Sequence, residues 1–132
     1  VIDYGCGSAI LAMVAAVLGA DKVYAVDIDP QAIAAASANI ERNQLADKIE
    51  IAHVDDMKLP VADILVANIL MNPLKELSST FSDLVKPEGH LVLSGLLHVQ
   101  AEECQTHYAS SFAMAEPVFS AEWCRLEGIK TT

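Results

Sequence analysis

Short apolar segments rich in β-branched residues alternate with longer amphipathic segments along most of this chain. This alternation is typical of βαβ units, in which helices connect parallel strands and cover the sheet. We therefore expect an α/β fold: a Rossmann-like, doubly wound, mostly parallel seven-stranded sheet with an antiparallel C-terminal hairpin. The expected strands are residues 1–4, 22–26, 49–54, 62–67 and 90–94, followed by the antiparallel pair 112–119 and 122–128.

Four helices are expected between these strands. Gly19 ends the first, Asp29 caps the second next to Pro30, and a turn at residues 86–89 ends the third. The expected ranges are 8–18, 30–42, 73–85 and 99–109. At 132 residues the chain has room for a single domain. Because it opens at Val1 without a Met, directly in an expected strand, we expect it to be a fragment that lacks an upstream segment.

Composition excludes several classes of function. Eight basic residues against eighteen acidic ones give a formal charge of −10, which repels nucleic-acid phosphates and attracts basic partners. The three cysteines form no CxxC pair, and the four histidines lack the spacing of metal ligands, so neither a disulfide framework nor a metal site is expected. No apolar stretch is long enough to cross a bilayer. A cytoplasmic location fits best.

A glycine loop follows the first expected strand. Gly5 and Gly7 let the backbone approach a ligand at the start of a helix, although such glycines also serve a plain turn. A dinucleotide fingerprint needs a third glycine where this chain has Ile10, which disfavours a nicotinamide-dependent oxidoreductase. Asp3 would repel a pyrophosphate and suits a ligand that carries an amine.

Three further polar residues stand after later strands. Asp27 ends the second strand, where open α/β sheets place the acid that binds ribose hydroxyls, and Asp29 is the better candidate for capping the next helix. Asn68 follows the fourth strand and is expected either in the ligand crevice or in a turn. Asp56 follows the third strand and could approach a purine amino group, but acidic pairs in loops are usually solvated.

Several segments together resemble class I S-adenosylmethionine-dependent methyltransferases, and more narrowly the ribosomal protein L11 methyltransferase family. The class-wide resemblance lies in residues 1–8, 26–32 and 68–70. The narrower one lies in residues 66–70 with Pro73 and Leu74, residues 93–97 with 100–102, and residues 122–126. Together they cover essentially the whole chain.

The resemblance implies a cytoplasmic enzyme that transfers methyl groups from S-adenosylmethionine to amino groups of ribosomal protein L11. It implies that residues 1–132 are the catalytic domain and that an N-terminal domain, absent here, recognises the substrate. The implied cofactor-binding residues are Asp3, Gly5, Gly7, Asp27, Asp56 and Asn68, with Asn68 also catalytic.

Two departures from the family pattern bear on cofactor binding. Ala9 replaces the usual last glycine of the loop, so its methyl group is expected to crowd the amino-acid tail of the cofactor. A threonine that the family has before the first strand would lie upstream of Val1. Two alternatives stay open: a class I methyltransferase acting on another protein or a small molecule, and a cofactor-binding module without activity.

Overall fold

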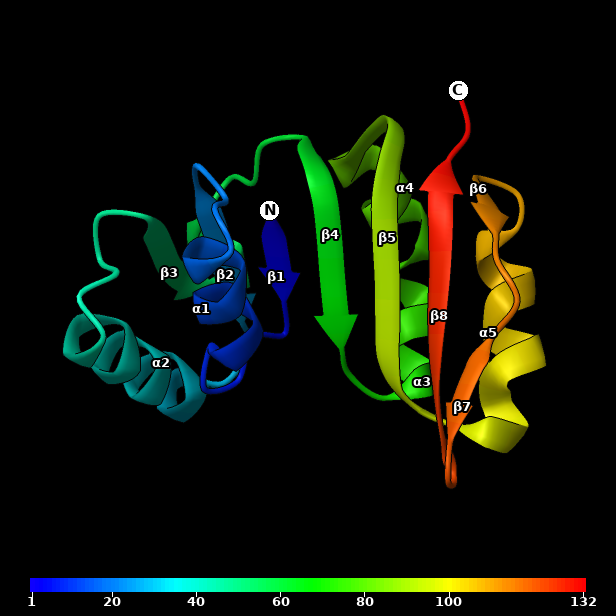
Figure 1. The fold of residues 1–132 in the computed structure, drawn as a ribbon, viewed down its shortest axis with the longest axis horizontal. Helices are drawn as coiled ribbons and strands as arrows, with labels where there is room; N and C mark the ends of the chain where they lie inside the picture. Colours follow the sequence, from blue (N-terminus) through cyan, green and yellow to red (C-terminus); the bar gives the residue numbers. More distant parts are fainter. The chain divides into compact units, whose positions relative to one another are not determined.

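In the computed structural model, which describes residues 1–132, strands and helices alternate as the sequence predicts (Figure 1). The chain divides into two compact units, Val1–Pro60 and Val61–Thr132. The first contains, in order, β1 (Ile2–Tyr4), α1 (Ile10–Val17), β2 (Val23–Asp27), α2 (Pro30–Arg42), β3 (Ile49–His53) and the short 3-10 helix η1 (Val54–Asp56).

The strands of the first unit are parallel, in the order β3-β2-β1. Both helices pack on one face of these strands, where α1 and α2 contribute mainly alanines to a buried cluster. Small side chains allow the helices to approach the sheet closely, as Ala12 and Ala36 do against Val23 and Ala25. The Asp29 carboxylate caps α2 by accepting the N–H of Gln31 at 2.9 Å, as the sequence predicts.

The second unit contains, in order, β4 (Ala62–Asn68), α3 (Met71–Glu76), α4 (Ser78–Leu84), β5 (Val85–Leu97), the 3-10 helix η2 (His98–Gln100), α5 (Ala101–Tyr108), β6 (Phe112–Met114), β7 (Val118–Ser120) and β8 (Trp123–Lys130). β4 and β5 are parallel, whereas β8 is antiparallel to β5, β6 and β7. Helices cover the sheet face that carries Leu65, Leu91 and Leu126. Tyr108 on α5 donates a buried hydrogen bond to the carbonyl of Leu74.

The expected fold class is confirmed. β1, β2 and β3 are parallel in the first unit, β4 and β5 are parallel in the second, and the C-terminal strand β8 is antiparallel to β5. The number of strands differs, since there are eight rather than seven. The single strand expected at residues 112–119 is two short strands, β6 and β7, separated by Pro117. A proline has no N–H to donate to a ladder, which explains the interruption.

Two further expectations were wrong in detail. The helix expected at residues 73–85 is broken at Leu77, where α3 ends and α4 begins with two serines and a threonine, residues of modest helix propensity. The turn expected at residues 86–89 belongs to β5. There the ladder with β4 shifts register and Glu88 has a φ of 66°, so these residues form an irregularity within one strand.

No helix of this structure has the length and hydrophobicity of a membrane span.

Candidate functional site

The glycine loop of the first unit is tied to the end of β2. The backbone N–H groups of Gly5 and Cys6 both donate to the carbonyl of Val26, at 2.8 and 3.0 Å. Gly5 and Gly7 have φ values of 78° and 54°, a region that side chains disfavour. The backbone path therefore favours glycine at both positions, and it brings the N–H of Gly7 within hydrogen-bond distance of Asp27.

Asp3 is buried under this loop, with only 1% of its surface exposed. One carboxylate oxygen, Oδ2, accepts the N–H of Ala12 in the first turn of α1, at 3.0 Å. The other, Oδ1, is buried without a hydrogen-bond partner. Burial raises the pKa of Asp3 to about 6, partly offset by the Ala12 hydrogen bond, and the charge of Asp27 adds a smaller rise.

Asp27 lies at the carboxyl end of β2, and two backbone groups hold its side chain. Its Oδ2 accepts the N–H of Gly7 at 2.9 Å, and its Oδ1 accepts the N–H of Asp29 at 3.0 Å. Each carboxylate oxygen retains a further lone pair that can accept a hydroxyl proton. The carboxylate is thus oriented by the loop and can still bind two hydroxyl groups.

The conformation of Ala9 shows where its methyl group lies. Ala9 has a φ of 71°, so it adopts the left-handed conformation usually taken by glycine. Its side chain is fully buried within the apolar cluster of the first unit, alongside Cys6 and Ala12. The methyl group therefore packs against core side chains.

Two other residues near the loop can be placed. Asp56 lies in η1, three residues beyond His53, which pairs with Asp27 across β2 and β3. The side chain of Asp56 is exposed and makes no hydrogen bond or ion pair.

Burial raises the pKa of the Cys6 thiol to about 12, so Cys6 stays protonated at neutral pH and is a poor nucleophile.

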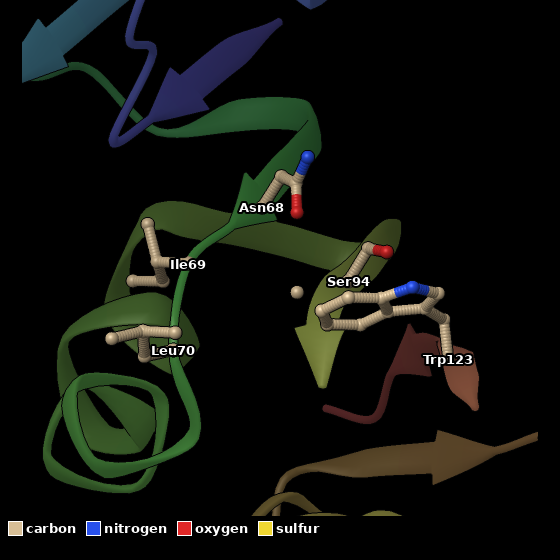
Figure 2. A pocket seen from close by; sticks show the side chains of 6 residues that line it. Asn68, Ile69, Leu70, Ser94 and Trp123 are labelled. Atoms are coloured by element: carbon tan, nitrogen blue, oxygen red, sulfur yellow. The ribbon is translucent and has the colours of Figure 1, made fainter. Parts of the chain in front are cut away.

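The second unit contains a pocket of about 480 Å³ at the carboxyl end of β4. Its lining residues come from three strands and the segment after β4: Asn68, Ile69, Leu70, Ser94, Gly95 and Trp123. Asn68 and Ser94 are register partners on the same sheet face. Figure 2 shows the indole of Trp123 extending from β8 toward the segment that carries Asn68, Ile69 and Leu70.

Gly95 allows the backbone of β5 to pass close to the segment after β4. A side chain there would put its Cβ 2.5 Å from the carbonyl oxygen of Ile69 and 2.9 Å from Oδ1 of Asn68. Gly95 also has a φ of 86°, at the point where the ladder between β5 and β8 shifts register. The position of the Asn68 amide therefore depends on the absence of a side chain at residue 95.

Sequence reasoning missed three lining residues: Ser94, Gly95 and Trp123. All three lie in segments that carry the family resemblance, and this resemblance is the only sequence feature that could have indicated them. The residue pattern around each one does not predict that it lines a pocket. Trp123 faces the pocket only because β8 pairs with β5, opposite Leu97. No group of three or more His, Cys, Asp or Glu side chains is close enough together to hold a metal ion.

Comparison with known proteins shows the same family along the whole chain. The family described as ribosomal protein L11 methyltransferase matches residues 1–131. A ribosomal protein L11 methyltransferase from Photobacterium profundum is 50% identical over 131 residues, which cover 98% of this chain and 45% of that protein. The chain therefore spans a little under half the length of such curated relatives.

Solved structures agree on the fold. The crystal structure of a ribosomal protein L11 methylase from Lactobacillus delbrueckii subsp. bulgaricus superimposes with a TM-score of 0.90 and 28% identity, covering 99% of this chain and 69% of the other. The N-methyltransferase NodS from Bradyrhizobium japonicum, solved with S-adenosyl-L-homocysteine, gives a TM-score of 0.77 at 20% identity. It covers 99% of this chain and 77% of NodS, and shows a likeness of fold.

Proposed function

This chain belongs to the ribosomal protein L11 methyltransferase family, and we propose that its protein transfers methyl groups from S-adenosylmethionine to amino groups of ribosomal protein L11. The observation that carries the proposal is the buried carboxylate of Asp3 under a glycine loop, together with a separate pocket built around Asn68. The relatives' names support the substrate and the reaction.

The residues of the first unit fit S-adenosylmethionine. Oδ1 of Asp3 lacks a partner, and a buried oxygen of this kind gains most from a cationic donor such as the ammonium group of an amino acid. The two oxygens of Asp27, held by Gly7 and Asp29, suit a pair of ribose hydroxyls. The bound S-adenosyl-L-homocysteine of NodS, a protein of similar fold, supports the same class of cofactor.

The cofactor, when bound, supplies a methyl group on a sulfonium that is already a good electrophile. The residues of this chain then have to hold a neutral amine in line with that methyl group, because positioning is the main source of acceleration. The amide oxygen of Asn68 can accept an N–H of the amine and so direct its lone pair. Ile69 and Leu70 line the pocket with apolar surface. A substrate that covers them excludes water from the amine, which favours the uncharged form of a lysine.

We also propose that residues 1–132 form the cofactor-binding catalytic part and that a separate domain recognises the substrate. The greater length of the relatives supports this division. A cytoplasmic location is proposed with it, because Cys6, Cys104 and Cys124 are all free and buried, as expected in a reducing compartment. Cell fractionation that recovers the protein with ribosomal proteins would support that location, and recovery from an oxidising compartment would contradict it.

The cofactor part of the proposal is tested by calorimetric titration of residues 1–132 with S-adenosyl-L-homocysteine, with NAD as the control ligand. We expect saturable binding of S-adenosyl-L-homocysteine and none of NAD. Binding of NAD alone would contradict the proposal and point to an oxidoreductase. Binding of neither ligand by this chain or by the natural full-length protein would also contradict it.

The transfer part is tested with the natural full-length protein, methyl-tritiated S-adenosylmethionine and ribosomal protein L11. We expect label in L11 but none in an unrelated basic protein or a free small amine. Replacing Asn68 with Ala should lower the rate at least about 100-fold, because the amine loses its orienting acceptor. Asn72→Ala, four residues further along, is the matched control and should keep the wild-type rate.

Three other results would each count against the proposal. Unchanged activity in Asn68→Ala would remove Asn68 from the mechanism. Label in a different substrate would indicate another methyltransferase specificity. Cofactor binding without any transfer would indicate a binding module.

A further inference from the structure

Four large apolar side chains are exposed around the mouth of the pocket in the second unit. Their exposed fractions are 72% for Leu70, 39% for Leu97, 45% for Val118 and 49% for Trp123. Leu70 and Trp123 also line the pocket itself. We call these four residues the mouth patch. A group of exposed apolar residues beside a ligand pocket is more typical of an interaction surface than scattered single ones are.

Sheet register places three members of the mouth patch on one face. Leu97 of β5 lies opposite Trp123 of β8, and Trp123 lies opposite Ser120 of β7. Side chains two residues apart on a strand share a face, so Val118 points to the same side as Ser120. Trp123 belongs to both the patch and the pocket lining, where Figure 2 shows it, so the patch is continuous with the pocket.

The hairpin that carries Val118 and Trp123 is held from its other face. The ring of Phe119, which points away from the patch, stacks on His98 with centroids 3.8 Å apart and planes 12° from parallel. The backbone N–H of His98 also donates to the carbonyl of Glu122 in the hairpin turn. These contacts fix the hairpin to η2. Because the hairpin is already ordered, binding of a partner to the patch costs little conformational entropy of the hairpin.

The charges of this unit favour a basic partner. Residues 61–132 contain nine acidic and four basic side chains. Three of the basic residues are in ion pairs, Lys75 with Glu103, Lys86 with Asp63 and Arg125 with Glu127. The fourth, Lys130, donates to the carbonyls of Ser82 and Val85. The acidic excess has no cation of the unit left to balance it, and exposed Glu122 adjoins Trp123.

We propose that the mouth patch docks the segment of a basic protein substrate that flanks the amine to be methylated. Apolar side chains next to that amine pack on Leu97, Val118 and Trp123, the amine enters the pocket toward Asn68, and neighbouring basic side chains face the acidic surface. This inference rests on the proposed function and adds to it a specificity surface within the catalytic part. It predicts that the patch controls affinity for the protein substrate and leaves cofactor affinity unchanged.

The test is a comparison of Val118→Lys with Ile129→Lys in the natural full-length protein. Val118 and Ile129 are exposed to similar degrees, 45% and 46%, and both lie on strands of this sheet, but Ile129 is six residues beyond Trp123 along β8. We expect Val118→Lys to raise KM for ribosomal protein L11 at least about tenfold by removing apolar contact and adding repulsion, with kcat and KM for S-adenosylmethionine within about twofold. Ile129→Lys should leave all three constants within about twofold. Val118→Ile, which keeps an apolar side chain at this position, should have the wild-type KM for L11.

A second readout uses the single tryptophan of the chain. With 5-fluorotryptophan incorporated into the natural full-length protein, the ¹⁹F resonance of Trp123, assigned by its loss in Trp123→Phe, should shift on adding L11 in the presence of S-adenosyl-L-homocysteine. A resonance that does not shift would contradict contact between L11 and the mouth patch.

Two failures can be told apart. Equal KM values for Val118→Lys and Ile129→Lys in an enzyme that methylates L11 would overturn the docking inference alone. Absence of L11 methylation by a wild-type protein that binds the cofactor would overturn the substrate assignment and the docking inference with it.

Discussion

The buried carboxylate of Asp3 lowers the stability of the free protein at neutral pH but favours the binding of a cationic ligand. Burial raises its pKa to about 6 from an ordinary value of 3.8, so the folded chain binds a proton there more tightly than the unfolded chain does. The stability that this proton contributes is fully present below about pH 4 and is lost as the pH rises through about 6. A cationic ligand at Oδ1 would recover part of that loss at neutral pH.

Replacing Asp3 with Asn should therefore stabilise the free protein at high pH and weaken cofactor binding. The raised pKa of Asp3 lowers the free energy of unfolding of the wild type by at most about 3 kcal/mol above pH 7. Asn removes this loss, but part of the gain is offset by the cost of burying an unpaired amide. Thermal unfolding at pH 5 and pH 8 checks this, because the variant should gain relative to wild type as the pH rises. A gap that does not change with pH would contradict the assignment of the charge effect, and undiminished affinity for S-adenosyl-L-homocysteine would contradict the binding role.

Ala9 offers a second test at the residue scale. Ala9→Gly removes the strain of the left-handed backbone, about 1 kcal/mol, and also deletes a buried methyl group worth about the same. The two effects oppose each other, so we expect stability to change by less than about 1 kcal/mol. Because the methyl group packs in the core, calorimetry should find affinity for S-adenosyl-L-homocysteine within about threefold. A larger gain in affinity would show that the methyl group crowds the ligand.

Among the elements, strand β5 links the core of the second unit to its pocket. Its register shifts next to Gly95, where the strand passes close to the carbonyl of Ile69. The amphipathic pattern predicts a strand at residues 90–94, but it does not predict the shift. Such an irregularity depends on the partner strand, which is distant in sequence, and a glycine alone is compatible with many turns.

Gly95→Ala should disturb the pocket more than backbone strain alone can explain. We expect a loss of stability of about 2–4 kcal/mol and a fall in kcat, because the added Cβ displaces Ile69 or Asn68. Gly19→Ala is the control, since Gly19 also has a positive φ, 111°, but no atom lies within 4 Å of its added Cβ. It should cost only about 1 kcal/mol and leave kcat unchanged. Denaturant titration and steady-state kinetics of both variants separate clash from strain. Equal effects on kcat would contradict the positioning of Asn68 by Gly95.

For the whole molecule, the alternation of apolar and amphipathic segments predicts the fold class, because it reflects the packing of each helix on its neighbouring strands. The same pattern places Asp27 and Asn68 at the carboxyl ends of β2 and β4. Trp123 could not be found this way, since its role depends on the antiparallel pairing of β8 with β5. The unpartnered Oδ1 of Asp3 could not be predicted either, because it depends on which backbone N–H groups of the folded chain reach this carboxylate.

The net charge of −10 on residues 1–132 predicts that salt weakens the binding of a basic substrate. Raising the salt concentration from about 50 mM to about 500 mM should increase KM for a basic protein substrate about tenfold, because salt screens exposed charges. Affinity for S-adenosyl-L-homocysteine should change by less than about twofold, since the contacts proposed for it, with Asp3 and Asp27, are local and partly buried. Kinetics and calorimetry across this range check both statements. A KM that does not depend on salt would show that charge plays no part in recognising the substrate.

Strand β8 pairs with β5, β6 and β7. Amide groups in such a strand can exchange with solvent only when several ladders open together. In D₂O, the amides of residues 124–129 should therefore be among the last in the second unit to acquire deuterium, at a rate set by its cooperative unfolding. A substitution that loosens β8 would then speed exchange in all three of its partners at once.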